Sequence, residues 1–463
     1  MPTRWPGARA QHGHSKLCPY ATHHHIPDGP GVPRHSPGDA TAARTFGRTA
    51  AAALELPGLQ ADPVLIPREQ RAAVAEHTTR LRVGIPSEAP NGERRVALAP
   101  YAAGLLVANG HEVRIEAGAG AASQFADHEY SDAGCAVVPS PAEVYGQSDL
   151  IAKVFPPRPD ELALMQERQI LLSALHLGDL SPATLARLME LRVTAIGFEF
   201  IADPDGTLPI VRMMHEISGS MAVQTAARLL ESGTHADGRL GRGLMLGGIS
   251  GVPPASVVIL GAGVIGEWAA RTAIGFGAHT VVLDTDLPAL RHIEHTLDRR
   301  VTTAMANPQY VRQAVAGADV VIGAMMAQGQ RSPVVVTEDM VARMRAGSVV
   351  VDLVIDQGGC IETSRPTTPD QPTFVVHGVV HHCVPNLPSS VARTASYALS
   401  NALTPYLLDI GHSGSVNDAL WTNVSLRSGT YVYRRHLTKK SLAAMFGMPH
   451  RDIELLIASG IGG

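Results

Sequence analysis

The sequence predicts an α/β protein whose strands lie in parallel sheets. Strand-like apolar runs alternate with helical patterns twice along the chain, before and after Leu208-Pro209, and this alternation is typical of parallel sheets. Of the 463 residues, 45% are hydrophobic, 17% charged and 4% aromatic, and 45 residues are glycine. This composition is globular and suits close packing of helices on sheets. The length favours two or three domains over a single core.

The first run of elements begins at Leu81, after a segment of different composition. Residues 1–80 contain Pro, Gly, Ala, Arg and His without sustained periodicity, including His23-His24-His25. We expect a disordered N-terminal extension there, and a solvated tail is favoured over a metal site. Beyond it, an apolar helix is expected at Pro100–Asn109. Strands are expected at Leu81–Pro86, Glu112–Glu116, Leu150–Phe155 and Gln169–Ala174.

The second run of elements has the pattern of a Rossmann-type domain. A long helix is expected at Ile217–Leu230, followed by a glycine-rich linker at Gly241–Pro254. After Pro388, a further helix is expected at Ala395–Ile410. The strand-like runs between them are Val257–Leu260, Thr280–Leu283, Val320–Ile322, Val349–Val354 and Phe374–His377.

One glycine-rich turn carries a specific chemical signal. Val257–Leu260 is followed by Gly261-Ala262-Gly263-Val264-Ile265-Gly266, and then by a helix. Here Gly261 permits the turn, Gly263 lets a pyrophosphate approach, and Gly266 lets the helix pack closely on the strand. Val264 and Ile265 belong to the same cofactor-binding turn, because a helix start points N–H groups and positive dipole at phosphates.

The next strand ends in Asp284, whose carboxylate can accept hydrogen bonds from a ribose diol and would repel a 2′-phosphate. NAD is therefore favoured over NADP. The alternative is a glycine-rich turn that binds no cofactor. It is disfavoured because strand, helix and acid all stand at the required spacing.

Charge and cysteine patterns exclude several other classes. The net charge is −4 with neutral histidines, so nothing favours nucleic acid or an anionic membrane as partner. The longest apolar runs have strand length and the N-terminus has no apolar signal core, so we expect a cytoplasmic protein without a membrane partner. The four cysteines (Cys18, Cys135, Cys360 and Cys383) form no C-x-x-C pair. We expect them to be reduced and expect no metal site.

From Leu81 to about Leu442 the sequence resembles the family of alanine dehydrogenase and the NAD(H)-binding transhydrogenase α subunit. The stretches that carry this resemblance include Arg95–Leu98, Gly118–Gly120, Leu175–Leu177, Gly251–Ala255, Asp352–Cys360, Ser364–Thr368 and Cys383–Asn386. The resemblance implies two Rossmann-like domains with an active-site cleft between them. Residues 81–210 plus 393–463 would form the substrate domain, and residues 211–392 the NAD-binding domain. It also implies a homo-oligomer, a hexamer in the family.

The resemblance further implies an activity: interconversion of L-alanine with pyruvate and ammonia, with NAD taking the hydride. Arg95 matches the arginine that holds the substrate carboxylate, and His176 and Asp356 match the catalytic histidine and aspartate. Asn386 matches a substrate and ribose contact, and Met214 a residue beside the nicotinamide. Taken without the resemblance, these would be a surface arginine, a core histidine, a turn aspartate and a packing methionine.

Two positions depart from the family pattern. The family's substrate-binding Lys-x-Lys-x-Pro is here Lys153-Val154-Phe155-Pro156-Pro157. Three interpretations stay open: Lys153 substitutes for the second lysine, Phe155 opens an apolar subsite for a bulkier substrate, or only NAD binding remains. The second departure is His215, which replaces a serine that touches the pyrophosphate, although imidazole can still donate a hydrogen bond. Arg212 and His215 either favour a substrate with a second acidic group or are solvated surface residues.

The favoured expectation is an NAD-dependent L-amino-acid dehydrogenase. One alternative is a related enzyme that reduces a different imine, as in opine-type condensation. The other is an NAD(H)-binding module like that of transhydrogenase. The NAD(H)-binding module is disfavoured because the transhydrogenase branch of the family lacks the equivalents of His176 and Asp356, which this chain retains.

Overall fold

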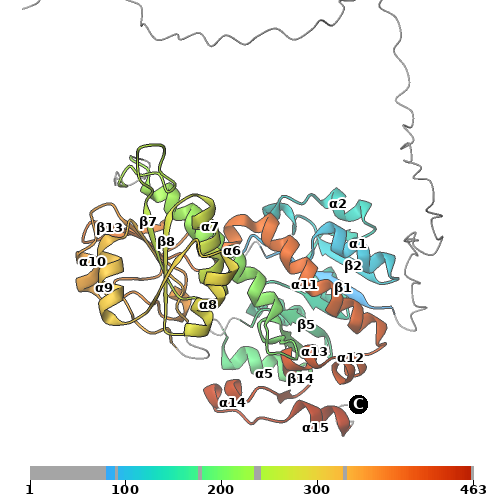
Figure 1. Ribbon diagram of the computed structural model, residues 1–463. Helices are drawn as coiled ribbons and strands as arrows, with labels where there is room; N and C mark the ends of the chain where they lie inside the picture. Colours follow the sequence, from blue (N-terminus) through green and yellow to red (C-terminus); the bar gives the residue numbers. More distant parts are fainter. Residues whose placement is uncertain (1–79, 89–91, 176–179, 234–240, 327–330, 460–463) are drawn as a thin grey trace, which may run out of the picture. The chain divides into compact units, whose positions relative to one another are not determined.

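The computed structural model describes residues 80–88, 92–175, 180–233, 241–326 and 331–459 (Figure 1). Nearly all of the predicted N-terminal extension and the predicted catalytic His176 lie outside the described residues. Within the described residues, no helix is both long enough and apolar enough to cross a membrane.

The first sheet has eight strands in the order β15-β14-β6-β5-β4-β1-β2-β3. Strands β1 to β6 pair in parallel, whereas β14 pairs antiparallel with β6 and β15 antiparallel with β14. The C-terminal part of the chain therefore completes a sheet that the N-terminal part begins. The strands are β1 (Arg82–Ile85), β2 (Glu112–Glu116), β3 (Ala136–Val138), β4 (Leu150–Ala152), β5 (Ile170–Ser173), β6 (Thr194–Gly197), β14 (Thr430–Tyr433) and β15 (His436–Leu437).

The helices that follow these strands are short, and several begin with proline, whose fixed φ suits the first helical turn. Every residue of β4 and β5 is buried, as expected where helices cover both faces of a parallel sheet. The helical elements of this region are α1 (Pro100–Ala108), η3 (Ala121–Ser123), α2 (Asp127–Asp132), α3 (Pro141–Gly146), α4 (Pro159–Leu164), α5 (Pro182–Glu190) and η4 (Phe198–Phe200).

The second sheet has seven strands in the order β12-β13-β11-β10-β7-β8-β9. All pairs are parallel except β12 with β13. From β9 inward, this is the strand order of a dinucleotide-binding Rossmann domain. The strands are β7 (Ser256–Leu260), β8 (His279–Asp284), β9 (Thr302–Met305), β10 (Val320–Gly323), β11 (Val349–Asp352), β12 (Thr373–Val376) and β13 (Val379–His382). The helices are α7 (Val264–Gly275), α8 (Leu287–Thr296), α9 (Pro308–Gly317), α10 (Glu338–Ala342) and η5 (Ile355–Gln357).

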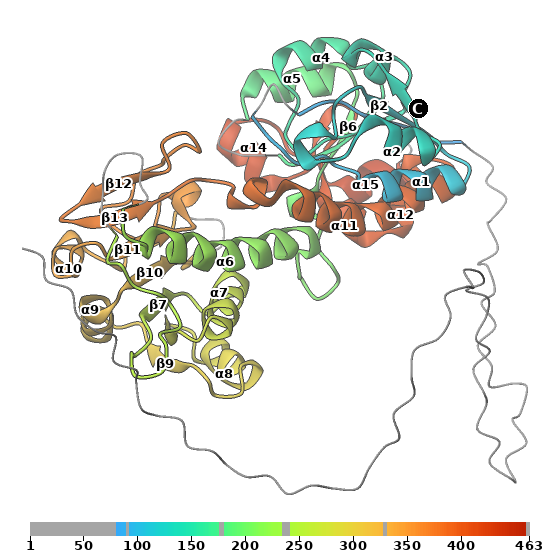
Figure 2. The ribbon, with the colours of Figure 1, turned by 90° about the horizontal axis from the view of Figure 1, so that it is seen from above.

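One long helix contacts both groups of elements, and a second long helix packs against it. Helix α6 (Pro209–Leu230) packs on α7 of the second group, and α11 (Ala392–His412) packs on both α6 and α1. Figure 2 shows α6 and α11 side by side. Gly219 permits the close α6–α7 approach, because a Cβ there would lie 2.3 Å from the Ile265 carbonyl oxygen. The remaining elements are η6 (Leu387–Val391), α12 (Val416–Thr422), α13 (Val424–Gly429), α14 (Lys440–Phe446) and α15 (Ile453–Ala458).

The α/β class with two Rossmann-like sheets is confirmed, while several element bounds differ from expectation. Helix α6 starts at Pro209 rather than Ile217, because proline suits a first helical turn. Strand β4 ends at Ala152 rather than Phe155. The strand expected at Phe374–His377 is the antiparallel β12, and the neighbouring parallel strand β13 was not expected.

Candidate active site

Arg95 lies in an irregular segment, Gly92–Ala99, that is held by serine side chains. The N–H groups of Val96 and Ala99 donate to the hydroxyls of Ser396 (3.0 Å) and Ser400 (2.7 Å) on α11. Both serines are buried, so they replace the hydrogen bonds that regular secondary structure would supply. The backbone around Arg95 is therefore fixed against α11.

The guanidinium of Arg95 is paired with Glu93. Arg95 Nε donates to Glu93 Oε1 (2.9 Å) and Nη2 donates to Oε2 (2.7 Å), which is bidentate geometry. Both side chains are buried. Burial by itself would raise the pKa of Glu93, but the hydrogen bonds and charge of Arg95, with a bond from Ser389, outweigh it and lower the pKa to about 2. Glu93 is therefore ionised near neutral pH.

Asn386 contacts the same carboxylate and lies shortly after β13 of the second sheet. It has left-handed backbone geometry (φ 56°) at the start of η6, and its Nδ2 donates to Glu93 Oε2 at 2.8 Å. The Ser389 hydroxyl donates to Glu93 Oε1, also at 2.8 Å. Arg95 Nη1 lies 3.2 Å from the sulfur of Met214 on α6. The structure thus brings together three residues that the sequence predicted separately: Arg95, Asn386 and Met214.

A pocket of about 320 Å³ opens beside this cluster. Its wall combines the polar groups of Glu93, Arg94, Asn386 and Ser389 with apolar surface from Phe155 and from the prolines and valine of two loops, and Arg95 lies behind Glu93 rather than in the wall itself. The lining residues are Gly92, Glu93, Arg94, Phe155, Pro369, Val384, Pro385, Asn386, Ser389 and Ser390. A pocket with an apolar wall and a few converging polar groups is typical of a small-molecule site.

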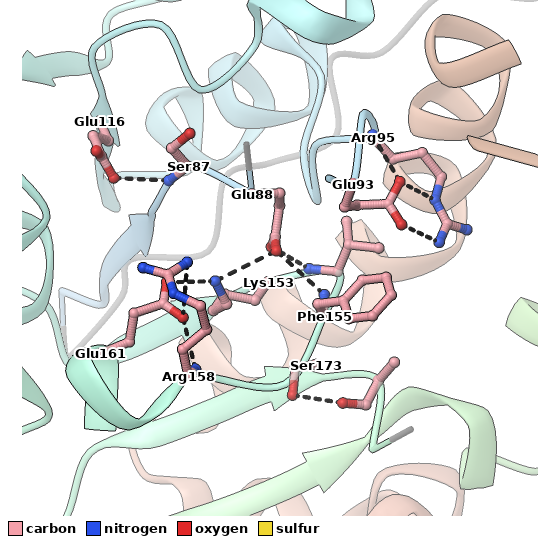
Figure 3. Close-up of polar contacts among 12 residues, drawn as sticks. Ser87, Glu88, Glu93, Arg95, Glu116, Lys153, Phe155, Arg158, Glu161 and Ser173 are labelled. Carbon is pink, nitrogen blue, oxygen red and sulfur yellow. Dashed lines mark hydrogen bonds and ion pairs between the residues drawn. The ribbon is translucent and has the colours of Figure 1, made fainter. Parts of the chain in front are cut away.

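Lys153 stands two residues before the pocket residue Phe155, but its side chain points to two glutamates and not into the pocket. Its side chain is fully buried, with Nζ 2.7 Å from Glu161 and 3.4 Å from Glu88. In Figure 3 the Lys153 side chain and the Phe155 ring leave the backbone in different directions. The two residues do not share a strand face, because β4 ends at Ala152. Of these two, the described pocket wall includes Phe155 and not Lys153.

Glu88 also fixes the backbone that carries Phe155. Its carboxylate accepts the N–H of Val154 at 2.7 Å and that of Phe155 at 3.4 Å (Figure 3). Sequence reasoning missed Glu88, Glu93 and Glu161. Glu93 stands two residues before Arg95 in a matched motif and could have been found there. Glu88 and Glu161 come close to the Lys153 ammonium only in the folded chain.

The glycine-rich turn fits a dinucleotide. Helix α7 begins at Val264 with Gly263 as its N-cap, and a Cβ on Gly263 would meet nothing within 4 Å, which leaves open space beside the backbone. By contrast, a Cβ on Gly266 would lie 1.8 Å from the Gly261 carbonyl oxygen. Asp284 at the end of β8 accepts the N–H of Ala262 and so ties the turn to the next strand.

His215 and Met214 lie on α6. Burial lowers the pKa of His215 to about 4, so its imidazole is neutral near pH 7 and offers a hydrogen bond rather than a charge. The charge of Arg212 is matched by Glu216 at 3.3 Å, one helical turn later. These contacts weaken the idea that Arg212 and His215 attract a second acidic group of the substrate.

Asp356 is exposed in η5, shortly after β11, at the carboxyl edge of the parallel sheet where such folds bind ligands. The buried Asp352 holds this turn by accepting the N–H groups of Val354 (3.2 Å) and Cys360 (3.1 Å). Burial raises the pKa of Asp352 against the effect of these bonds. The described residues contain no group of three side chains suited to a metal ion, and the cysteines among them are free and buried.

Comparisons with known proteins agree with this architecture. The family descriptions "Alanine dehydrogenase/PNT, N-terminal domain" and "Alanine dehydrogenase/PNT, C-terminal domain" match residues 84–218 and 222–440. Alanine dehydrogenase of Halomonas elongata is 39% identical over 81% of this chain and 100% of that protein. Alanine dehydrogenase of Mycobacterium tuberculosis is 39% identical over 82% of this chain and 100% of its own length.

Solved structures give the same result. An L-alanine dehydrogenase structure is 40% identical, with a TM-score of 0.75 over 79% of this chain and 99% of that one. A transhydrogenase from Sinorhizobium meliloti shares the fold at 24% identity and a TM-score of 0.66, over 77% of this chain and 100% of that one. The two sheets, the glycine-rich turn and these matches together place the chain in the alanine dehydrogenase/PNT family.

Proposed function

We propose that this protein is an NAD-dependent L-amino-acid dehydrogenase of the alanine dehydrogenase type, acting on the CH–NH2 group. In the balanced reaction, an L-amino acid, NAD⁺ and water give a 2-oxo acid, ammonium, NADH and a proton. The observation that carries the proposal is the meeting of Arg95, Asn386 and Met214 around Glu93, beside a pocket, in a chain that also has a complete dinucleotide turn.

NAD would be held by the turn of Gly261, Gly263, Val264, Ile265 and Gly266. When bound, NAD⁺ accepts the hydride from the substrate α-carbon. The N–H groups at the start of α7 would face its pyrophosphate, and Asp284 would accept from its ribose hydroxyls while disfavouring a 2′-phosphate. His215, neutral at pH 7, would donate to a phosphate oxygen.

The substrate carboxylate would be oriented by Arg95 and Asn386. His176 and Asp356 would move the protons: Asp356 with His176 activates water or ammonia, and His176 exchanges a proton with the carbinol oxygen. His176 follows β5 in the sequence and Asp356 follows β11. Both thus come after the carboxyl ends of parallel strands, where ligands bind in open α/β sheets, and this supports their assignment.

The identity of the substrate side chain depends on Phe155. Its ring lines the pocket together with Pro369, Val384 and Pro385, and this apolar wall favours a 2-oxo or amino acid with an apolar side chain larger than the methyl of alanine. The Glu88 and Glu161 contacts of Lys153 favour this interpretation over substitution by Lys153. Direct contact of Lys153 with the substrate stays a prediction.

We also propose that residues 81–210 with 393–463 act as the substrate domain and residues 211–392 as the NAD-binding domain. The pairing of β14 with β6 supports the return of the C-terminal part to the first sheet. We propose that the protein is cytoplasmic and forms a homo-oligomer, and light scattering on the purified full-length chain would test the oligomeric state.

The proposal is tested by NADH oxidation with ammonium and a panel of 2-oxo acids of increasing side-chain size. We expect turnover with at least one member, and faster turnover with larger apolar side chains than with pyruvate. If NADH binds but every 2-oxo acid is inert, the NADH-binding module is the correct interpretation.

The Phe155→Lys variant tests the pocket assignment. Restoring an ammonium at this wall should raise activity on pyruvate and lower it on larger 2-oxo acids, because the apolar surface is lost. An unchanged preference would mean that Phe155 does not face the substrate side chain.

A further inference from the structure

Glu93 receives hydrogen bonds from both sides of the candidate site. Its Oε1 accepts the N–H groups of Arg94 (3.0 Å) and Arg95 (2.9 Å), Nε of Arg95 (2.9 Å) and the Ser389 hydroxyl (2.8 Å). Its Oε2 accepts Nη2 of Arg95 (2.7 Å) and Nδ2 of Asn386 (2.8 Å). One carboxylate therefore joins the irregular segment of the first sheet region to the η6 segment that follows the second sheet.

These contacts make displacement of Glu93 by a substrate carboxylate unfavourable. Glu93 is 3% exposed, and a buried carboxylate that leaves its donors is costly unless new donors replace them. The two backbone N–H groups cannot follow it, because Ser396 and Ser400 hold the same segment on α11. A substrate must therefore be recognised with Glu93 in place, by donors that Glu93 does not use.

The geometry indicates one such donor. Nε and Nη2 of Arg95 are bonded to Glu93, and this pairing sets the guanidinium plane. Nη1 is then directed to the sulfur of Met214, which is a weak acceptor that a carboxylate can readily replace. Asn386 is restrained by the same carboxylate, since one of its two amide N–H groups is committed to Glu93.

We propose that Glu93 is the positioning residue of the substrate-carboxylate site. It holds Arg95 and Asn386 so that their remaining donors face one carboxylate, and it cancels most of the charge of Arg95. Recognition then depends on the direction of hydrogen bonds more than on net charge. The inference rests on the proposed function, because it deepens the role given to Arg95 and Asn386.

The Glu93→Gln variant tests this. The amide keeps the shape of Glu93 but replaces one acceptor oxygen with a donor that faces the donors of Arg95 or Asn386. Loss of a charge-assisted hydrogen bond that orients Arg95 or Asn386 should raise KM for the 2-oxo acid about tenfold or more. KM for ammonium should change by less than about twofold, because none of the hydrogen bonds of Glu93 involves Asp356. The Kd of NADH should change less than KM for the 2-oxo acid, because Glu93 would influence the nicotinamide ribose only through Asn386.

Asp319→Asn is a matched control for general destabilisation. Asp319 is also a buried carboxylate paired with an arginine, Arg242, and it accepts the N–H of Ser256 at 2.9 Å. It precedes β10, at the sheet edge opposite the glycine-rich turn. This variant should lower Tm without a selective change in KM for the 2-oxo acid. The inference is wrong if Glu93→Gln leaves that KM unchanged, or if all its kinetic constants worsen together as in the control.

Failure of the proposed function would appear separately. If the wild-type protein oxidises no NADH with any 2-oxo acid, the proposed activity fails. Calorimetric titration of the NADH complex with oxamate, an unreactive carboxylate the size of pyruvate, then tests Glu93. Binding by the wild type, weakened about tenfold or more in Glu93→Gln, supports the positioning role. Absence of oxamate binding to the wild type, or equal binding by both proteins, overturns it.

Discussion

Removal of the Lys153 ammonium separates a structural role from a substrate-binding role. In Lys153→Met the side chain keeps its length, but Glu88 and Glu161 lose their shared buried cation. Removing one partner of a buried ion pair destabilises proteins by about 3–5 kcal/mol, because a buried charge is left uncompensated. We expect the lower part of this range, since Glu161 is also paired with Arg158 at 3.6 Å.

The pH dependence of this variant follows from Glu88. Burial raises the pKa of Glu88, and Lys153 and the Val154 N–H partly offset that rise. Without Lys153 the pKa rises further. A carboxyl group whose folded-state pKa exceeds its unfolded value binds its proton more tightly when folded, so its contribution to stability falls as pH rises through that interval. The stability difference between wild type and Lys153→Met should therefore be larger at pH 8 than at pH 5.

The assay is urea unfolding of both proteins at pH 5 and pH 8, at fixed protein concentration and without NADH, because bound ligand would shift the transition. Steady-state KM for the 2-oxo acid is measured alongside. The reasoning is refuted if Lys153→Met unfolds within about 1 kcal/mol of wild type while its KM rises about tenfold or more. That outcome would identify Lys153 as a substrate ligand.

Two further predictions concern the nucleotide turn. Gly266→Ala should raise the Kd of NADH about tenfold or more in a fluorescence titration, because its Cβ would lie 1.8 Å from the Gly261 carbonyl oxygen. Gly275→Ala, on the same helix with nothing within 4 Å of the added Cβ, is the control and should bind NADH normally. Asp284→Ser should raise the affinity for NADPH relative to NADH about tenfold or more, since it removes a carboxylate near a 2′-phosphate. An unchanged ratio would place the adenosine ribose elsewhere.

Much of the fold was predictable because its signals are local. The apolar run of β7, the three glycines and Asp284 at the end of β8 are contiguous in sequence, and the structure places them as one βαβ unit. In the second sheet, β9 and β13 were missed because their residues lack a clear apolar pattern, and in the first sheet β3, β6, β14 and β15 were not expected. β9 is partly exposed, and β13 contains His381 and His382, whose burial only the neighbouring strands explain.

The candidate site was predictable to a lesser degree, because electrostatic partners come from distant segments. Arg95 was found from its motif, but its pairing with Glu93, Asn386 and Ser389 requires the fold that brings η6 to the Gly92–Ala99 segment. The pairing of Lys153 likewise depends on the fold. Glu88 follows β1 and Glu161 lies on α4, and nothing in the local Lys153–Pro157 pattern indicates that the ammonium lies between them.

The positions of Arg95 and Lys153 indicate how this member of the family differs from one that has the Lys-x-Lys-x-Pro motif. Arg95 and Lys153 are both paired with glutamates, and the arginine that lines the pocket wall is Arg94. Arg95 still has Nη1 directed at a weak thioether acceptor, whereas the Lys153 side chain is 0% exposed. A carboxylate can therefore be held at one end of the substrate by Arg95. The other end meets Phe155, so discrimination among 2-oxo acids should follow the apolar contact of the side chain rather than charge at the keto group.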